Sequence, residues 1–90
     1  MPRFYLHIVD SFGRAPDEEG REFGSVQEAR KEAVKGARSL LIGELEHGRL
    51  DLRGRIEVAD DRQGVADVVQ FADVVEIVRG QLPGSEGTDC

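Results

Sequence analysis

His7 is the residue of this sequence whose surroundings most suggest chemistry. Tyr5 and Val9 lie two positions before and after it, so the three side chains share one face of an extended segment. An imidazole in this setting is able to ligate a metal, accept a proton or contact a small molecule. Only Asp10 offers a second ligand nearby, so we favour a histidine that packs beside Tyr5 and bonds to a neighbour. We predict that Tyr5, His7 and Val9 form a ligand or interface surface, and we assign no metal site.

Two acidic clusters, Asp17-Glu18-Glu19 and Asp60-Asp61, supply the oxygen ligands that Mg²⁺ and Ca²⁺ prefer. Neither cluster has the spaced acids and the terminal Glu of a calcium loop. We therefore interpret both clusters as solvated acidic turns.

The sequence contains no pattern typical of an enzyme. The glycine-rich motifs that bind nucleotide phosphates, G-x-G-x-x-G after a strand and G-x-x-x-x-G-K-[ST], are both missing. No Ser or Cys nucleophile stands in a recognisable setting, and a chain of 90 residues offers little cleft for a carboxylate pair. We predict no catalytic residues, no cofactor and no enzymatic activity.

A stripe of basic residues is a candidate surface for nucleic acid or for an acidic partner. Its members are Lys31, Lys35 and Arg38 at i, i+4 and i+7, followed by Arg49, Arg53 and Arg55. The net charge of −6 and the neighbouring Glu28 and Glu32 repel a phosphate backbone. We therefore favour a solvated helix face over a nucleic-acid site.

Small residues gather on one side of the expected helix. Gly36, Ser39 and Gly43 are spaced i, i+3 and i+7, and a glycine inside a helix costs up to about 1 kcal/mol relative to alanine. Ile42 lies near the polar side and has no core role there. Because small residues let another backbone approach closely, we predict that Gly36, Ser39, Ile42 and Gly43 form a helix interface, with neutral drift as the alternative.

The length of 90 residues predicts one domain, over residues 1–79, followed by a disordered tail over residues 80–90. The apolar runs are too short to cross a bilayer, and His7 interrupts the only apolar segment near the N-terminus. Cys90 is the single cysteine, so a disulfide scaffold is excluded. These features predict a cytoplasmic protein without a membrane partner.

The elements that must position these residues follow from hydrophobic periodicity. Residues 3–10 alternate as a strand, with Phe4, Leu6 and Ile8 on the better core face. Residues 11–14 suggest a turn, residues 15–20 an acidic loop, and residues 21–23 a short returning strand.

A long helix follows the Ser25 to Glu28 capping box and extends from Val26 to about His47, with Gly48 as its stop. Its apolar stripe has the helical period of 100° per residue and consists of Val26, Ala29, Ala33, Val34, Ala37, Leu40, Leu41 and Leu45.

The second half of the chain predicts a hairpin. Residues 55–59 alternate, residues 60–64 form a loop in which Gly64 takes a positive φ, and residues 65–71 return. Asp67 shares a face with Val65 and Val69, which a β-bulge or a sheet buried on both sides would explain. Residues 72–79 fit either a strand or a short helix. The predicted fold is α+β in the order β-β-α-β-β, an antiparallel sheet of three or four strands with one helix on one face and the other face uncovered.

Several short sequence motifs, taken in order, resemble those of a known family. They are Met1-Pro2-Arg3-Phe4-Tyr5-x-His7, Asp17-x-Glu19-Gly20-x-Glu22-Phe23, Ala29-Arg30-x-Glu32-Ala33 and Ile56-Glu57-Val58-x-Asp60. Over about residues 1–75 the chain resembles a family of small alphaproteobacterial proteins described as a domain of unknown function. Ser11-Phe12 departs from the Asp-Gly type of turn expected there. The resemblance implies a small bacterial cytoplasmic protein and transfers no active site.

Three functions stay open at this point. We favour a homo-oligomeric interaction or regulatory module, with a homodimer as the expected form and an unknown protein partner as a further possibility. The second is a small-molecule or metal-binding domain centred on His7 and Tyr5. The third is nucleic-acid binding through the basic helix stripe.

Overall fold

The computed structural model describes residues 1–83, so most of the predicted disordered tail lies outside the described residues. The order of the elements is β1 (Arg3–Asp10), β2 (Gly13–Ala15), β3 (Arg21–Glu22), α1 (Val26–Leu45), β4 (Arg55–Ala59), β5 (Val65–Gln70) and the 3-10 turn η1 (Phe71–Asp73).

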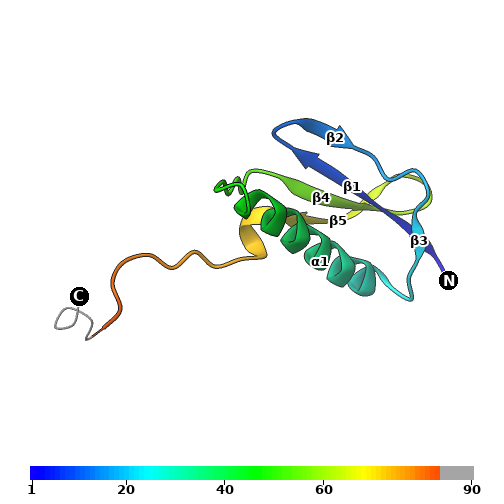
Figure 1. The fold of residues 1–90 in the computed structure, drawn as a ribbon. Coiled ribbons are helices and arrows are strands. Elements are labelled where there is room, and N and C mark those ends of the chain that lie inside the picture. The colour runs from blue at the N-terminus through cyan, green and yellow to red at the C-terminus, as the bar shows by residue number, and fades with distance from the viewer. Residues whose placement is uncertain (84–90) are drawn as a thin grey trace.

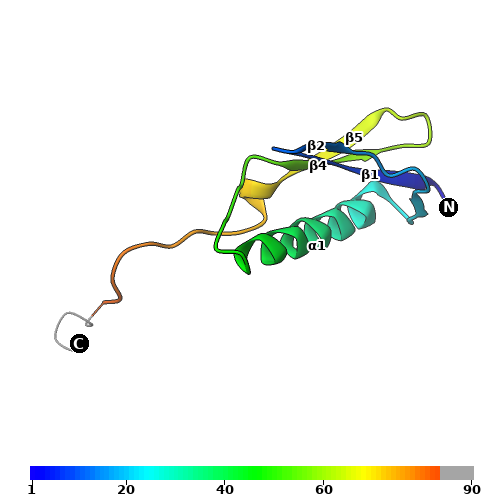
Figure 2. The ribbon, with the colours of Figure 1, turned by 45° about the horizontal axis from the view of Figure 1, so that its top comes forward.

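One antiparallel sheet and one long helix form two layers, which confirms the α+β prediction (Figure 1). The strand order is β2-β1-β4-β5, and β3 also pairs with β1. Helix α1 lies on one face of the sheet, as Figure 2 shows. Within residues 1–83, no helix combines the length and apolar character needed to cross a membrane.

Helix α1 begins where the capping box predicts. The hydroxyl of Ser25 accepts a hydrogen bond from the N–H of Glu28 at 3.3 Å, which satisfies one of the free donors of the first turn. The buried stripe is Ala29, Ala33, Ala37 and Leu41, at every fourth position. The helix ends at Leu45, slightly before the expected His47, and Gly48 takes a positive φ of 78° in the turn that follows.

The first hairpin differs from its prediction, because residues 13–15 form the strand β2 and only Ser11 and Phe12 remain in the turn. A carboxylate oxygen of Asp10 accepts from the N–H of Phe12 at 2.9 Å and closes this turn. Both β2 and β3 pair along the same edge of β1, with residues 16–20 looped out between them. Pro16 has no N–H to donate, so the ladder cannot continue through it.

The second hairpin contains the predicted bulge. Val58 pairs with Asp67 and Ala59 pairs with Val65, which leaves Ala66 as the extra residue of β5. The expected positive φ at Gly64 is wrong, since Gln63 adopts it instead, at 64°. A carboxylate oxygen of Asp60 accepts from the N–H groups of Arg62 and Gly64, both at 2.9 Å, and holds the loop in this shape.

Residues 72–79 form neither the strand nor the regular helix that the sequence allowed. The chain makes the single turn η1, closed by the N–H of Val74 donating to the carbonyl of Phe71, and then continues without regular structure. Phe71 and Val74 are both buried, so this turn completes the core beneath α1.

Candidate interaction site

Helix α1 covers only part of the sheet. An α-helix is about 10 Å wide with its side chains, whereas four strands at about 4.8 Å spacing span about 14 Å between the outer two. The side chains of Ile56, Val58 and Val69, on β4 and β5, are buried. Leu6 and Ile8 point to the same face from β1 and stay only partly buried. The helix therefore sits over β4 and β5 and leaves part of β1 open.

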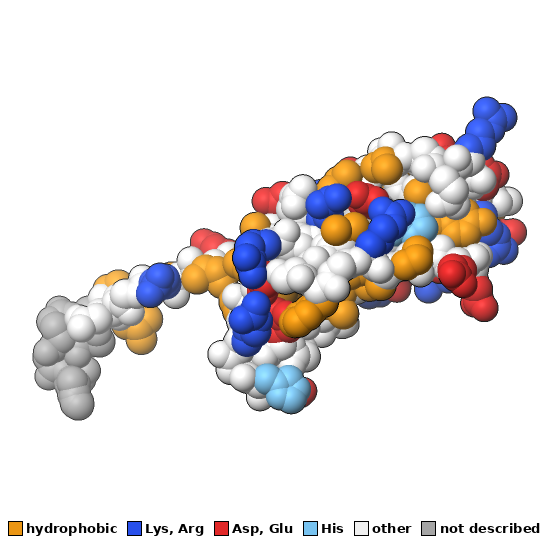
Figure 3. Space-filling model, turned by 90° about the horizontal axis from the view of Figure 1, so that it is seen from above, with side chains coloured by type: hydrophobic (Ala, Val, Ile, Leu, Met, Phe, Trp, Pro, Cys, Tyr) orange, Lys and Arg blue, Asp and Glu red, His pale blue; other side chains and the backbone are white. Residues whose placement is uncertain are grey.

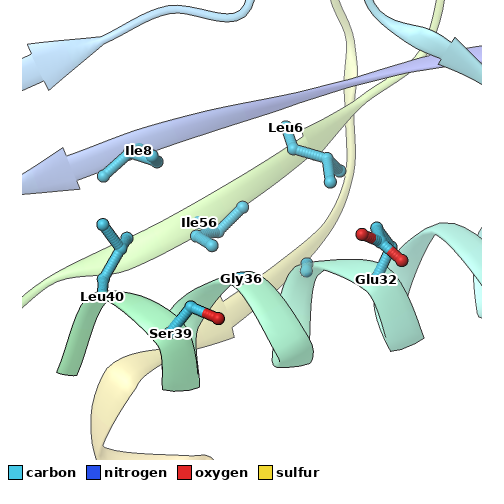
Figure 4. Close-up of a pocket in the computed structure, with 8 residues that line it drawn as sticks. Leu6, Ile8, Glu32, Gly36, Ser39, Leu40 and Ile56 are labelled. Carbon is cyan, nitrogen blue, oxygen red and sulfur yellow. The ribbon is translucent and has the colours of Figure 1, made fainter. Parts of the chain in front are cut away.

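An apolar groove results between α1 and β1. Its volume is about 330 Å³ and it is lined by Leu6, Ile8, Glu32, Ala33, Gly36, Ser39, Leu40 and Ile56. In Figure 4, Leu6 and Ile8 extend from β1 toward the helix, and Leu40 rises from α1 toward Ile8. We call this hollow the α1–β1 groove.

Gly36 forms the floor of the α1–β1 groove. A methyl group added at Gly36 would meet only Cδ1 of Ile56, at 3.7 Å, an ordinary contact distance. Figure 4 shows Gly36 on the helix between Leu40 and Glu32, with the Ile56 side chain of β4 above it. The small residue leaves room for an incoming side chain.

The α1–β1 groove continues toward the N-terminal end of the helix. A second hollow shares Leu6 and Glu32 with it and reaches Phe4 and Phe23. Arg21 stands at this end, where its guanidinium lies 3.2 Å from the Glu32 carboxylate. The two hollows are neighbours along β1, and the second is lined in part by the charged residues Asp17, Arg21 and Glu32.

The predicted helix interface divides between two sides of α1. Gly36 and Ser39 line the α1–β1 groove, whereas Ile42 lines a separate groove on the opposite side. That opposite groove has a volume of about 340 Å³ and is formed by Arg38, Leu41, Ile42, Leu45, Leu50, Val75 and Ile77. A methyl group at Gly43 would meet nothing within 4 Å. The four residues therefore do not form one surface.

His7 lies on the other face of the sheet and is only 4% exposed. Nδ1 accepts a hydrogen bond from the backbone N–H of Asp17 at 3.0 Å, and Nε2 lies 3.0 Å from Oε1 of Gln63. The ring also stacks on Tyr5, with centroids 6.3 Å apart. Both ring nitrogens are thus engaged within the chain, which favours the structural interpretation of His7 over a ligand site.

Asp17 holds the looped-out residues 16–20 against β1. Its carboxylate accepts from the backbone N–H groups of Leu6, Glu19 and Gly20, at 3.0 to 3.2 Å. Burial raises the pKa of Asp17, but these three N–H donors together outweigh it and lower the pKa below its ordinary value. Asp17, the first residue of this acidic cluster, is therefore held in place by hydrogen bonds within the fold.

The sheet face away from α1 carries paired charges where Val9 lies. Figure 3 looks onto this face, where basic and acidic side chains lie next to one another with small apolar patches between them. Glu57 bonds to Arg55 at 3.0 Å and to Arg14 at 2.9 Å. The bond from Arg55 is the main cause that lowers the pKa of Glu57. Half-buried Val9 has Arg14 and Arg55 as its cross-strand neighbours.

All four arginines of the basic stripe are bonded within the chain. Nε of Arg38 donates to the carbonyl of Val74 at 2.8 Å. Arg49 and Arg53 both lie about 3 Å from the carboxylate of Asp51, and the bond from Arg53 holds the pKa of Asp51 well below its usual range. These contacts reduce the charge that the stripe offers to a phosphate backbone. Among the described residues, no three His, Cys, Asp or Glu side chains are grouped to hold a metal ion.

Sequence reasoning missed the α1–β1 groove, although one signal for it was present. Leu6, Ile8 and Leu40 were all placed on core faces, and a single helix was set against a sheet of three or four strands. The widths of the two layers already show that one helix cannot cover the whole sheet. What the sequence could not show is which strands the helix covers.

Comparison with known proteins identifies a family for this chain. No curated protein and no solved structure matches the chain. A family model described as "Domain of unknown function (DUF6894)" matches residues 3–72, which include every element from β1 to β5 and every residue of the α1–β1 groove. The match covers more than half of the chain, so the protein belongs to this family of domains of unknown function.

Proposed function

We propose that this protein is a non-catalytic interaction module that forms a homodimer through the α1–β1 groove. The observation that supports the proposal is the position of Leu6 and Ile8, which face the core side of the sheet yet are left half-covered by their own helix. Burying apolar surface is worth about 25 cal/mol per Å², so a second copy that covers this groove gains free energy.

The edges of the sheet are poor sites for association, which further favours the groove. At the β5 edge, Val68 has both backbone groups engaged: its N–H donates to Asp67 at 2.7 Å and its carbonyl accepts from Arg30 at 3.2 Å. At the opposite edge, β2 and β3 have only three and two residues. Short and blocked edge strands resist pairing with another chain.

The cytoplasmic location and bacterial origin belong to the same proposal. They are supported by the single Cys90, which fits a reducing compartment, and by the N-terminal Met-Pro-Arg-Phe-Tyr-x-His pattern.

Two variants of α1 test the role of the groove. Leu40→Glu places a charge inside the α1–β1 groove, and Ile42→Glu places the same charge on the opposite side of the same helix. Both residues are partly exposed, at 39% and 61%, so both variants are expected to fold. Sedimentation velocity at micromolar concentration should show a dimer for the wild type and Ile42→Glu and a monomer for Leu40→Glu. A dimer that persists in Leu40→Glu would show that the interface lies outside the α1–β1 groove.

A further inference from the structure

The chain carries a segment with several exposed apolar side chains after the turn η1. Residues 76–83, which we call the C-terminal arm, follow the half-buried Val75. Ile77, Val78 and Leu82 are 50%, 80% and 76% exposed. Figures 1 and 2 both show the chain after η1 leading away from the sheet and the helix. Large apolar side chains on such a segment are typical of a contact with another molecule.

The α1–β1 groove alone is too small for a stable interface. It is lined by eight residues, whereas a stable interface uses about 20–30 residues on each side. A dimer through the groove therefore needs a second contacting element, and the C-terminal arm is a segment of the described chain with exposed apolar side chains.

The dimensions of a straightened arm fit the groove. In the structure the arm bends at Gly80, whose φ is 111°. Docked in an extended form, at about 3.3–3.6 Å per residue, the arm would place Val78 and Leu82 about 13–14 Å apart on the same side. Along α1, Glu32 and Leu40 define a groove about 12 Å long at 1.5 Å per residue. Two apolar side chains at this spacing match the hollow between Leu40 and Glu32, with Gly36 at its floor.

The position of the arm favours the groove of another copy over its own. The arm starts beside Ile42 and Leu45, on the side of α1 opposite to the α1–β1 groove. It then leads away from the domain and does not turn around the helix (Figure 2). In a two-fold dimer each arm would reach the other copy, so that one contact is made twice.

We infer that the C-terminal arm of each copy docks in the α1–β1 groove of a second copy, with Val78 and Leu82 as its apolar contacts. This inference rests on the proposed homodimer and names the segment that holds it together. The family model matches residues 3–72, which include the groove residues. The arm lies outside the matched residues.

Cross-linking between two different variants tests the exchange. One chain carries Val78→Cys and the other carries Ser39→Cys in the groove, and both carry Cys90→Ala so that no other thiol is present. Mild oxidation of the mixture should yield a disulfide heterodimer on a non-reducing gel. Val65→Cys, on β5 at the far side of the sheet, replaces Ser39→Cys in the control mixture. We expect at least fivefold more heterodimer with Ser39→Cys than with Val65→Cys.

Equal yields in the two mixtures would overturn the exchange. A chain that carries both Val78→Cys and Ser39→Cys and closes mainly on itself would overturn it as well, because the arm would then occupy its own groove. Light scattering of the wild type separates the two claims. A monomer contradicts the homodimer and the exchange together, whereas a dimer without the cross-link contradicts the exchange alone.

Charge substitutions along the arm give a second test. Val78→Asp and Leu82→Asp should each weaken the dimer at least tenfold, as measured by its dissociation constant. Gln81→Asp adds the same charge on the opposite side of an extended arm and should change the constant less than twofold. Equal weakening by all three variants would show that the arm acts only through its net charge.

Discussion

The backbone N–H of Asp17 donates a hydrogen bond to Nδ1 of His7 across 3.0 Å. A backbone N–H is only a donor, so Nδ1 must be the unprotonated nitrogen of the neutral ring. Nε2 then carries the proton and donates a hydrogen bond to Oε1 of Gln63. The imidazole joins β1, the loop 16–20 and the β4–β5 loop, and it acts as a structural tie.

We predict that the neutral His7 ring is the Nε2–H tautomer. Nitrogen-15 chemical shifts of the two ring nitrogens report the tautomer directly. The exposed His47 serves as an internal comparison in the same spectrum. A neutral His7 ring with its proton on Nδ1 would be incompatible with the bond from Asp17.

Replacing His7 by leucine should destabilise the fold. The change leaves the N–H of Asp17 without its acceptor and Gln63 without its partner, and an unsatisfied buried polar group costs about 1–3 kcal/mol. His47→Leu is the matched control, since His47 is exposed and a surface change of this kind stays within about 0.5 kcal/mol. Urea denaturation measures both, and equal effects would contradict the structural role of His7.

The lowered pKa of Asp17 predicts a specific loss of stability in acid. A carboxyl whose pKa is lower in the folded than in the unfolded chain adds stability above the unfolded value, here near 3.8. That contribution disappears as the pH falls through the folded pKa. In Asp17→Asn the free energy of unfolding should therefore fall less steeply below about pH 5 than in the wild type.

Asp61→Asn removes the same charge from an exposed position of the β4–β5 loop and should keep the wild-type pH profile. Urea denaturation at several pH values compares the three proteins. If Asp17→Asn and the wild type lose stability in parallel, the bonds from Leu6, Glu19 and Gly20 do not lower the pKa of Asp17.

The same substitution at two glycines should have opposite effects. Gly20 has a φ of 68°, and a methyl group there would lie 2.7 Å from Cε2 of Tyr5, so Gly20→Ala should cost about 1–3 kcal/mol. Gly43 lies inside α1 with nothing within 4 Å, so Gly43→Ala should stabilise the helix by up to about 1 kcal/mol. Thermal unfolding at a fixed protein concentration shows the sign of each change, and a stabilising Gly20→Ala would contradict the packing under Tyr5.

The sequence predicted the elements whose signals are local. The stripe that contains Ala29, Ala33 and Ala37, and the cap at Ser25, place α1 within a few residues of its observed bounds. The three-residue strand β2 was missed because Gly13, Arg14 and Ala15 show no apolar alternation. Its position is fixed by pairing with β1, which is a tertiary contact.

The site residues depended on contacts that no short window of sequence contains. The partners of His7 are ten and 56 residues away along the chain. The split of Ile42 from Gly36 and Ser39 depends on where α1 crosses the sheet, which the helical period alone does not specify. The sequence therefore predicted which residue types could take part in chemistry. How their side chains are arranged in space followed only from the folded structure.

Light scattering of the wild-type protein across a micromolar dilution series tests the central claim most directly. The homodimer through the α1–β1 groove predicts a mass of twice the 9.9 kDa of a single chain at the upper end of the series, falling toward the single-chain mass on dilution. A mass of 9.9 kDa at every micromolar concentration would contradict it.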